Sequence, residues 1–131
     1  MIVVDASALL EVLLRTPAAD AVERRLFASR GETMHAPHLV DVEIAQVLRR
    51  YAAAGEVDGA RGRAALADLA DLPLRRYPHA LLLTRAWDLR HNFTAYDAVY
   101  VALAEALDAP LVTRDRRLAA SAARHVHVEL V

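Results

Sequence analysis

Asp97 is a carboxylate in a segment whose other side chains are mostly apolar. It lies near the start of TAYDAVYVALAEALDAP, residues 94–110, a helical stretch made mainly of Ala, Val, Leu and Tyr. Two more acids stand where strands are predicted to end: Asp5 closes MIVVD, and Asp115 follows LVT within LVTRDRRLA. In open α/β sheets, ligand sites gather at the carboxyl ends of the strands. These three acids are therefore candidates for one site.

Glu43 is a fourth candidate because it does not stand on the solvent face of its predicted helix. Its helical neighbours at i−4, i−3 and i+4 are Leu39, Val40 and Val47, so it borders the apolar stripe. Helices that follow strands often begin at the ligand-binding edge of the sheet, so a first-turn acid such as Asp97 can point into the same crevice. The four acids are therefore predicted to converge.

Converging carboxylates need a counter-charge, and this requirement indicates a metal site. Two carboxylates about 4 Å apart repel each other by roughly 4 kcal/mol at an effective dielectric constant near 20. The chain has no Cys, and its one His pair with convincing metal-ligand spacing, His125-x-His127, is interpreted as one face of a terminal strand. All-oxygen ligands favour Mg²⁺ or Mn²⁺ over zinc. A water bound to such an ion can attack phosphorus while the ion neutralises the leaving oxygen.

Each acid also has an explanation without chemistry. Asp5 and Asp115 precede predicted helices and can act as N-caps. Thr94 and Asp97 match the spacing of a capping box, in which two helix N–H groups are satisfied reciprocally. Glu43 can be a boundary residue with a buried stem. These explanations weaken when taken together, because separate caps do not predict a common destination for all four side chains.

Strands and helices alternate along the chain. Apolar runs with β-branched residues predict strands at 1–5, 33–36, 111–113 and 126–130, and a weaker fifth at 74–77. Helical patterns occupy 6–15, 16–29, 38–55, 57–72, 79–91, 94–109 and 116–125. In the second of these, Thr16 is the predicted N-cap and Pro17 the first helical residue. The alternation predicts an α/β fold of three α/β/α layers around a parallel sheet.

Length and composition bound the class of protein. The 131 residues predict a single domain over 1–131, able to bury a sizeable core. No stretch is long and apolar enough for a membrane span, and the N-terminus lacks the pattern of a signal peptide, so we expect a soluble cytoplasmic protein. Net charge is −1, and every one of the 16 basic residues is Arg. Without the four candidate acids, 16 basic residues face 13 acidic ones.

The motifs together resemble a known family. VVDASALL, the Glu of VEIAQVLRR, TAYDAVYVALAEAL and LVTRDRRLA occur in an order similar to that of PIN domains. More narrowly, the chain resembles VapC, the toxin ribonucleases of VapBC toxin–antitoxin modules. The resemblance covers essentially the whole chain. It implies a five-stranded parallel sheet flanked by helices and a metal-dependent endoribonuclease, a hydrolase of RNA phosphodiester bonds.

The resemblance also assigns roles to residues of this chain. It implies catalytic metal ligands for Mg²⁺ or Mn²⁺ at Asp5, Glu43, Asp97 and Asp115. Asp115 matches the position that contributes most variably in the family. Ser7 and Thr113 match hydroxyl positions that support the site.

Protein partners are expected from the same resemblance and from composition. It implies a cognate antitoxin whose tail wraps the toxin, and a toxin that forms a homodimer. The chain is 56% hydrophobic, so apolar helix surface left unburied would suit an amphipathic segment of a partner. A partner's Arg could pair bidentately with the carboxylates and displace the metal. The alternative is that the apolar excess is ordinary core for a sheet covered on both faces.

Some side chains near the motifs have two interpretations. Arg114, Arg116 and Arg117 adjoin Asp115 and could contact RNA phosphate, or could be a solvated helix start. The aromatic residues Tyr96, Tyr100 and Trp87 could stack on RNA bases, but packing in the core or at its boundary is the favoured interpretation.

Three rival functions fit less well. A phosphoacceptor domain of the receiver type would want a Lys near the last strand, and the chain has none. A haloacid-dehalogenase-like phosphatase would want a second Asp two residues after Asp5, where Ser7 stands. A catalytically silent PIN-like module that binds protein or RNA remains the alternative. Four costly acids argue against it, because a scaffold has no reason to keep them.

Overall fold

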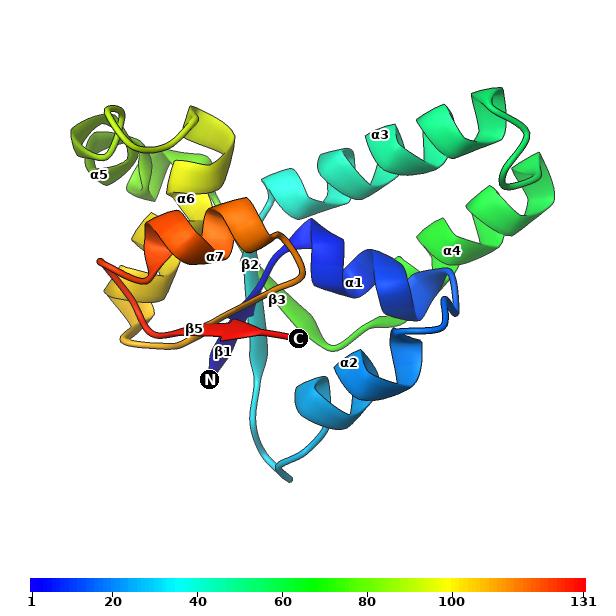
Figure 1. Cartoon of the computed structure of the whole chain (residues 1–131), viewed down its shortest axis with the longest axis horizontal. Helices are drawn as coiled ribbons and strands as arrows, with labels where there is room; N and C mark the ends of the chain where they lie inside the picture. Colours follow the sequence, from blue (N-terminus) through cyan, green and yellow to red (C-terminus); the bar gives the residue numbers. More distant parts are fainter.

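The computed structural model describes residues 1–131 and contains one sheet of five parallel strands in the order β3-β2-β1-β4-β5 (Figure 1). The strands are β1 (Ile2–Val4), β2 (Met34–Pro37), β3 (Leu74–Tyr77), β4 (Leu111–Thr113) and β5 (Val128–Leu130). The helices are α1 (Ala6–Leu13), α2 (Ala19–Leu26), α3 (Leu39–Ala53), α4 (Gly59–Asp71), the 3-10 helix η1 (His79–Leu81), α5 (Leu83–Asp88), α6 (Ala95–Leu107) and α7 (Arg116–Ala122). The predicted α/β class and all five predicted strands are confirmed.

The sheet is covered on both sides. Helices α1 to α4 lie on one side, and α5 to α7 lie on the other (Figure 1). The central strand β1 pairs with β2 and β4, with Val3 opposite His35 on one side and Leu111 on the other. All three residues of β1 are buried, as expected for a parallel strand with helices on both faces.

Helix α6 is the most deeply buried helix. Its residues from Ala98 to Ala104 are all buried, and the helix packs against β1, β2 and β4. A helix that is apolar on every side belongs in the interior, and the small Ala side chains allow close approach to the sheet. Asp97 therefore stands in the first turn of α6, directly before its buried part.

Two local predictions about helices are wrong. Helix α2 begins at Ala19 with Ala18 as its N-cap, not at Thr16. The hydroxyl of Thr16 instead donates to the side chain of Glu11 and accepts from the backbone N of Ala18 at 3.2 Å. This contact with the preceding helix holds Thr16 in the connecting turn.

The predicted helix over 79–91 is broken into η1 and α5. The first turn closes from the backbone N of Leu82 to the carbonyl of His79 at 2.8 Å, which is the shorter 3-10 spacing. Leu82 is buried, whereas Leu81 and Leu83 are exposed. The run of leucines at 81–83 favours one continuous helix in the sequence, but in the structure only Leu82 of the three packs into the core. None of the helices combines the length and apolar character that a membrane crossing would need.

Candidate active site

All four predicted acids line one cleft of about 460 Å³. Asp5 directly follows β1, Asp115 follows β4, Asp97 lies in the first turn of α6, and Glu43 lies on α3. Because β1 and β4 are neighbours in the sheet, the acids that follow them lie at the same edge although 110 positions separate them. The structure thus brings the four side chains to one place, and their roles there stay predictions.

Asp5 is held by hydrogen bonds at both carboxylate oxygens. The Ser7 hydroxyl donates to Oδ1 at 2.7 Å, as does the backbone N of Ala8 at 3.1 Å. The Thr113 hydroxyl donates to Oδ2 at 2.7 Å. Burial raises the pKa of Asp5, and the bonds from Thr113, Ser7 and Ala8 act in the opposite direction. Asp5 is therefore a fixed carboxylate rather than a mobile one.

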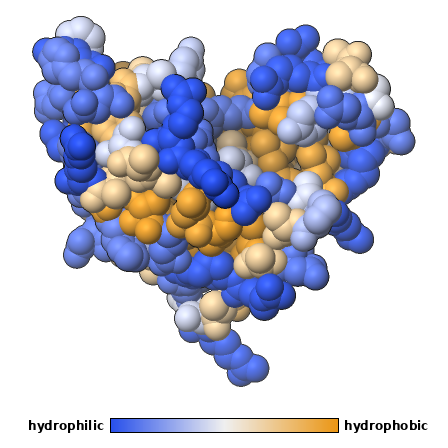
Figure 2. All heavy atoms as spheres, viewed as in Figure 1, coloured by the Kyte–Doolittle hydropathy of each residue, from blue (hydrophilic) through white to orange (hydrophobic).

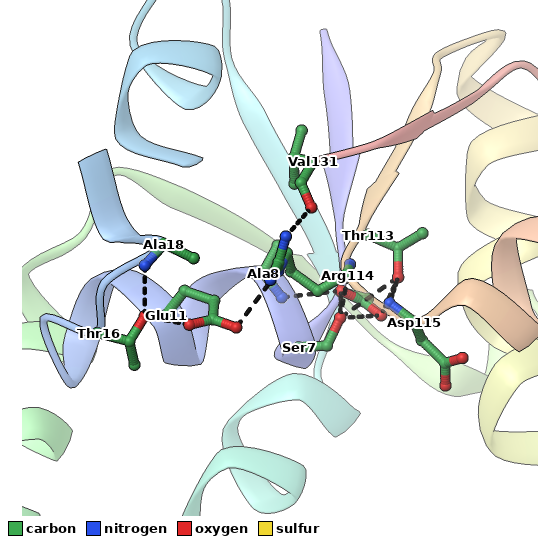
Figure 3. Close-up of polar contacts among 10 residues, drawn as sticks. Ser7, Ala8, Glu11, Thr16, Ala18, Thr113, Arg114, Asp115 and Val131 are labelled. Carbon is green, nitrogen blue, oxygen red and sulfur yellow. Dashed lines mark hydrogen bonds and ion pairs between the residues drawn. The ribbon is translucent and has the colours of Figure 1, made fainter. Parts of the chain in front are cut away.

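Ser7 and Thr113 join the ends of the two central strands (Figure 3). Their hydroxyl oxygens lie 3.3 Å apart, and the backbone N of Arg114 donates to Ser7 at 2.9 Å. The backbone N of Asp115 donates to Thr113 Oγ1 at 2.9 Å. The two hydroxyl side chains thus contact both the Asp5 carboxylate and the backbone of Asp115, and the supporting role that the resemblance implies for them stays a prediction.

Glu43 has one protein partner. The Tyr100 hydroxyl donates to Oε2 of Glu43 at 2.5 Å, across the cleft from α6 to α3. Burial raises the pKa of Glu43; the Tyr100 bond lowers it, and the charges of Asp5 and Asp97 raise it further. Packing was the only role favoured for Tyr100 from the sequence, and this contact was not predicted. The available signal was spacing, since Tyr100 lies three residues after Asp97 on the same helix face.

Asp97 forms only half of the predicted capping box. Its backbone N donates to the Thr94 hydroxyl at 3.2 Å, so Thr94 caps α6. The Asp97 carboxylate accepts no hydrogen bond from the protein. Burial raises its pKa, as does the charge of Asp115, while Arg117 lowers it. Capping therefore does not account for the carboxylate, which is left available in the cleft.

Asp115 is the most exposed of the four acids and is the N-cap of α7. Its Oδ1 accepts from the backbone N of Arg117 at 2.8 Å and of Leu118 at 3.1 Å. Asp5 likewise caps α1. The capping explanation is thus correct for both residues, and both also line the cleft. The two explanations do not exclude each other, because a helix that starts at the strand edge places its cap there.

The three arginines beside Asp115 differ in their surroundings. The guanidinium of Arg114 is engaged with Glu11 at 3.3 Å and with the carbonyl of Val131 (Figure 3). Arg117 lines a smaller adjoining hollow together with Asp97 and Asp115. Arg116 is exposed, and its side chain makes no hydrogen bond. Of the three, Arg117 is the one that lines a hollow with Asp97 and Asp115 and whose charge lowers the pKa of Asp97.

Two aromatic residues predicted to pack in the core or at its boundary are exposed, and a His pair predicted to lie on a strand lies outside it. Tyr100 is buried as expected, but Tyr96 is 64% exposed and Trp87 is 68% exposed. The short helix α5 turns Ala86 inward, which leaves Trp87 outside. His125 and His127 precede β5 instead of sharing a face of it, because that strand begins only at Val128.

Comparisons with known proteins place the chain in a family. A model described as PIN domain matches residues 2–123. Ribonuclease VapC12 of Mycobacterium tuberculosis is 44% identical over 131 residues, covering 100% of this chain and 99% of that protein. Ribonuclease VapC9 of the same species is 52% identical over 118 residues, covering 90% and 88%. The chain belongs to the PIN-domain family, in its VapC branch.

The fold of this PIN domain also matches a solved complex. The structure of VapBC2 from Rickettsia felis, bound to a DNA fragment from their promoter, gives a TM-score of 0.70 at 16% identity. The match covers 99% of this chain and 98% of that one. At this level of identity, the likeness shows the architecture alone.

The chemistry of the cleft fits a hard divalent cation, and PIN ribonucleases typically depend on a metal. No group of three or more His, Cys, Asp or Glu side chains lies close enough together to chelate an ion as a set. Mg²⁺ does not require such a cage, since it is commonly bound through one or two carboxylates and keeps several waters. The carboxylates raise one another's pKa across the cleft, and a cation between them would relieve this repulsion.

We expect Asp97→Asn to stabilise the metal-free PIN domain at neutral pH. The raised pKa of Asp97 means that folding disfavours its ionised form, so stability is greatest below the ordinary aspartate pKa and falls as pH rises through the raised value. The amide removes this cost and so raises the free energy of unfolding. Urea unfolding in chelator should show the gain near pH 7 and its loss near pH 3.

Asp20→Asn is the matched control, because Asp20 is also a first-turn aspartate but is exposed on α2. Both substitutions remove the same favourable interaction with a helix N-terminus. Equal effects of the two substitutions at neutral pH would contradict a repulsive cleft.

Proposed function

We propose that this chain is a metal-dependent endoribonuclease that acts as the toxin of a toxin–antitoxin pair in the cytoplasm. Residues 1–131 would form a single PIN-like domain. The observation that carries the proposal is the gathering of Asp5, Glu43, Asp97 and Asp115 in one cleft. Its support from relatives is the name ribonuclease VapC, borne by proteins 44% and 52% identical to this chain.

The side chains divide the work of holding the site. Asp5 is fixed by Ser7 and Thr113, and Glu43 is fixed through Oε2 by Tyr100. The oxygens that accept no protein hydrogen bond are both of those of Asp97, together with Oε1 of Glu43 and Oδ2 of Asp115. These oxygens are free to face a cation or a water. When bound, Mg²⁺ or Mn²⁺ supplies an acidified water as nucleophile and neutralises charge on the leaving oxygen of the phosphodiester.

RNA is a polyanion, so an acidic cleft needs positive charge around it. Arg117 lies beside Asp97 and Asp115, and its guanidinium is free for bidentate contact with a phosphate. Arg116 follows Asp115 directly and is exposed. Arg114 is a weaker candidate, since its guanidinium is already paired with Glu11. We therefore assign phosphate contact first to Arg117.

A groove continuous with the cleft suits an antitoxin. A second hollow of about 280 Å³ shares Ser7, Leu10 and Val47 with the cleft. Its lining mixes apolar side chains such as Leu14 with charged ones, namely Glu11, Arg50 and Arg114. Apolar atoms reach the surface in this region, between α1 and the α3–α4 arm (Figure 2). An amphipathic segment could bury its apolar face here while its Arg enters the cleft and pairs with the carboxylates.

A homodimer is part of the same proposal, and exposed apolar side chains are available for it on η1 and α5. Leu81, Leu83 and Trp87 are 75%, 55% and 68% exposed. The alternative function, a catalytically silent PIN-like module, predicts protein or RNA binding without cleavage, so a cleavage assay separates the two.

RNA hydrolysis should require added Mg²⁺ or Mn²⁺ and stop in chelator. Asp97→Asn keeps the Thr94 cap, which uses only the backbone N of residue 97, but it removes one charge from the site. We expect it to slow cleavage by roughly 100-fold or more, beyond the effect of losing an outer partner of a metal ligand. Gel analysis of labelled RNA measures the rate, with Asp20→Asn as the control. Undiminished cleavage by Asp97→Asn would exclude the proposed mechanism.

Arg117→Gln should weaken RNA binding and its dependence on salt. Each phosphate contact contributes about 0.7 to the slope of log K against log salt for a single strand. Fluorescence anisotropy in the Asp97→Asn background, where cleavage is blocked, measures this slope. Arg124→Gln serves as control, because Arg124 is an exposed arginine just beyond the other end of α7. Equal slopes for both variants would remove Arg117 from the RNA contact.

Expression of the chain alone should arrest growth, and expression with the product of its neighbouring gene should relieve the arrest and yield a complex. Leu14→Lys replaces an apolar side chain of this groove with a charged one and is expected to weaken that complex. Phe27→Lys, at an exposed position after α2, should leave it intact. Unimpaired growth with well-folded, RNA-cleaving protein and no complex would reject the toxin assignment and leave the nuclease assignment standing.

A further inference from the structure

We propose that Tyr100 is a positioning residue for this reaction, whose buried hydroxyl holds the Glu43 carboxylate in place at the wall of the cleft. The inference rests on the proposed function, since it assigns a further role within the same site. Tyr100 is not expected to touch substrate or metal. It acts through Glu43.

The contact itself is short, and the Tyr100 hydroxyl also faces the backbone N–H of Ala6. Tyr100 is only 2% exposed, and its hydroxyl donates to Oε2 of Glu43 at 2.5 Å. No other side chain donates to the Glu43 carboxylate. The bond is the one side-chain hydrogen bond that either residue makes. A buried hydroxyl without a partner is costly, and Glu43 provides that partner for Tyr100.

The bond joins two elements that are otherwise separate. Glu43 lies on α3 and Tyr100 lies on α6, and these helices belong to opposite sides of the sheet (Figure 1). They do not pack against each other along their lengths. Tyr100 also lies on the same face of α6 as Asp97, three residues earlier. One buried helix thus carries both a candidate ligand and the group that orients another ligand across the cleft.

Glu43 needs such an anchor because its other neighbours repel it. Asp5 and Asp97 place negative charge near its carboxylate, and a glutamate side chain has several rotatable bonds through which it can turn towards solvent. The Tyr100 hydrogen bond opposes that rotation and leaves Oε1 free. Outer partners that orient a metal ligand typically affect metal affinity or activity by roughly 10- to 100-fold.

Tyr77 provides a matched control for Tyr100. Its hydroxyl bonds to Nδ1 of His35 at 2.8 Å, between neighbouring strands β2 and β3. Tyr77→Phe therefore also removes one side-chain hydrogen bond of a tyrosine hydroxyl, but it does so away from the four acids. Any general effect of losing such a hydroxyl on stability should appear in both variants.

The experiment compares Tyr100→Phe with Tyr77→Phe and the parent chain. Mn²⁺ affinity is measured without RNA by electron paramagnetic resonance, and RNA cleavage and thermal unfolding are measured separately. We expect Tyr100→Phe to weaken Mn²⁺ binding and cleavage by roughly 10- to 100-fold. Tyr77→Phe should bind Mn²⁺ and cleave RNA as the parent does. Parent-like Mn²⁺ affinity and cleavage in folded Tyr100→Phe would overturn the inference.

A double-mutant cycle tests whether Tyr100 acts through Glu43. In the Glu43→Gln background, Tyr100→Phe should cause little further loss of Mn²⁺ affinity, because the carboxylate that it orients is gone. A loss of the same size in both backgrounds would overturn the inference. Failure of the parent itself to bind Mn²⁺ or to cleave RNA would instead reject the proposed function, and the inference with it.

A second substitution covers the case in which Tyr100→Phe does not fold. Tyr100→4-aminophenylalanine keeps an N–H donor at the para position of the ring, so it should fold and hold Glu43 nearly as the hydroxyl does. We expect its Mn²⁺ affinity to approach that of the parent, and we expect Glu43→Gln in this background to lower that affinity as much as it does in the parent. Parental Mn²⁺ affinity that Glu43→Gln leaves unchanged would overturn the inference, because Glu43 would then contribute nothing for the donor to position.

Discussion

The repulsion among four carboxylates in one cleft is the constraint to which the surrounding structure responds. Three of the acids are restrained by donors of different kinds. Asp5 has two hydroxyls and a backbone N–H, Glu43 has a buried phenol, and Asp115 has the N-terminus of α7. Asp97 has none. The site is thus preorganised on three sides and keeps one carboxylate that only a cation, a proton or water can satisfy.

Helix α6 connects the core to this site. The residues from Ala98 to Ala104 pack the helix against the central strands, and they anchor the first turn that precedes them. Asp97 and Tyr100 are carried by that turn and the next one. The apolar residues of α6 pack the helix into the core, and by doing so they place the Asp97 carboxylate at the cleft. Sites built on rigid elements hold their geometry better than sites built on loops.

The negative potential of the cleft has two consequences for its partners. It favours a divalent cation, and for the same reason it favours a guanidinium from another chain. RNA, in contrast, is repelled unless the cleft is neutralised and arginines such as Arg117 stand beside it. A partner's Arg and a metal would therefore compete for the same carboxylates. The adjoining groove between α1 and α3, lined in part by Leu10, Leu14 and Val47, would give a protein partner affinity that a free cation lacks.

The sequence by itself determined the parallel α/β class, the five strands and the positions of the four acids, because strand periodicity, helix breakers and acids after strands are local signals. Ser7 and Thr113 were indicated only by the resemblance to PIN domains. The sequence did not determine that Tyr100 meets Glu43, that Trp87 and Tyr96 face outward, or that the segment 79–91 breaks after Leu81. Those outcomes depend on how α3, α5 and α6 pack against the sheet. Which face of a helix is buried, and which side chain crosses a cleft, is decided only when distant segments come together.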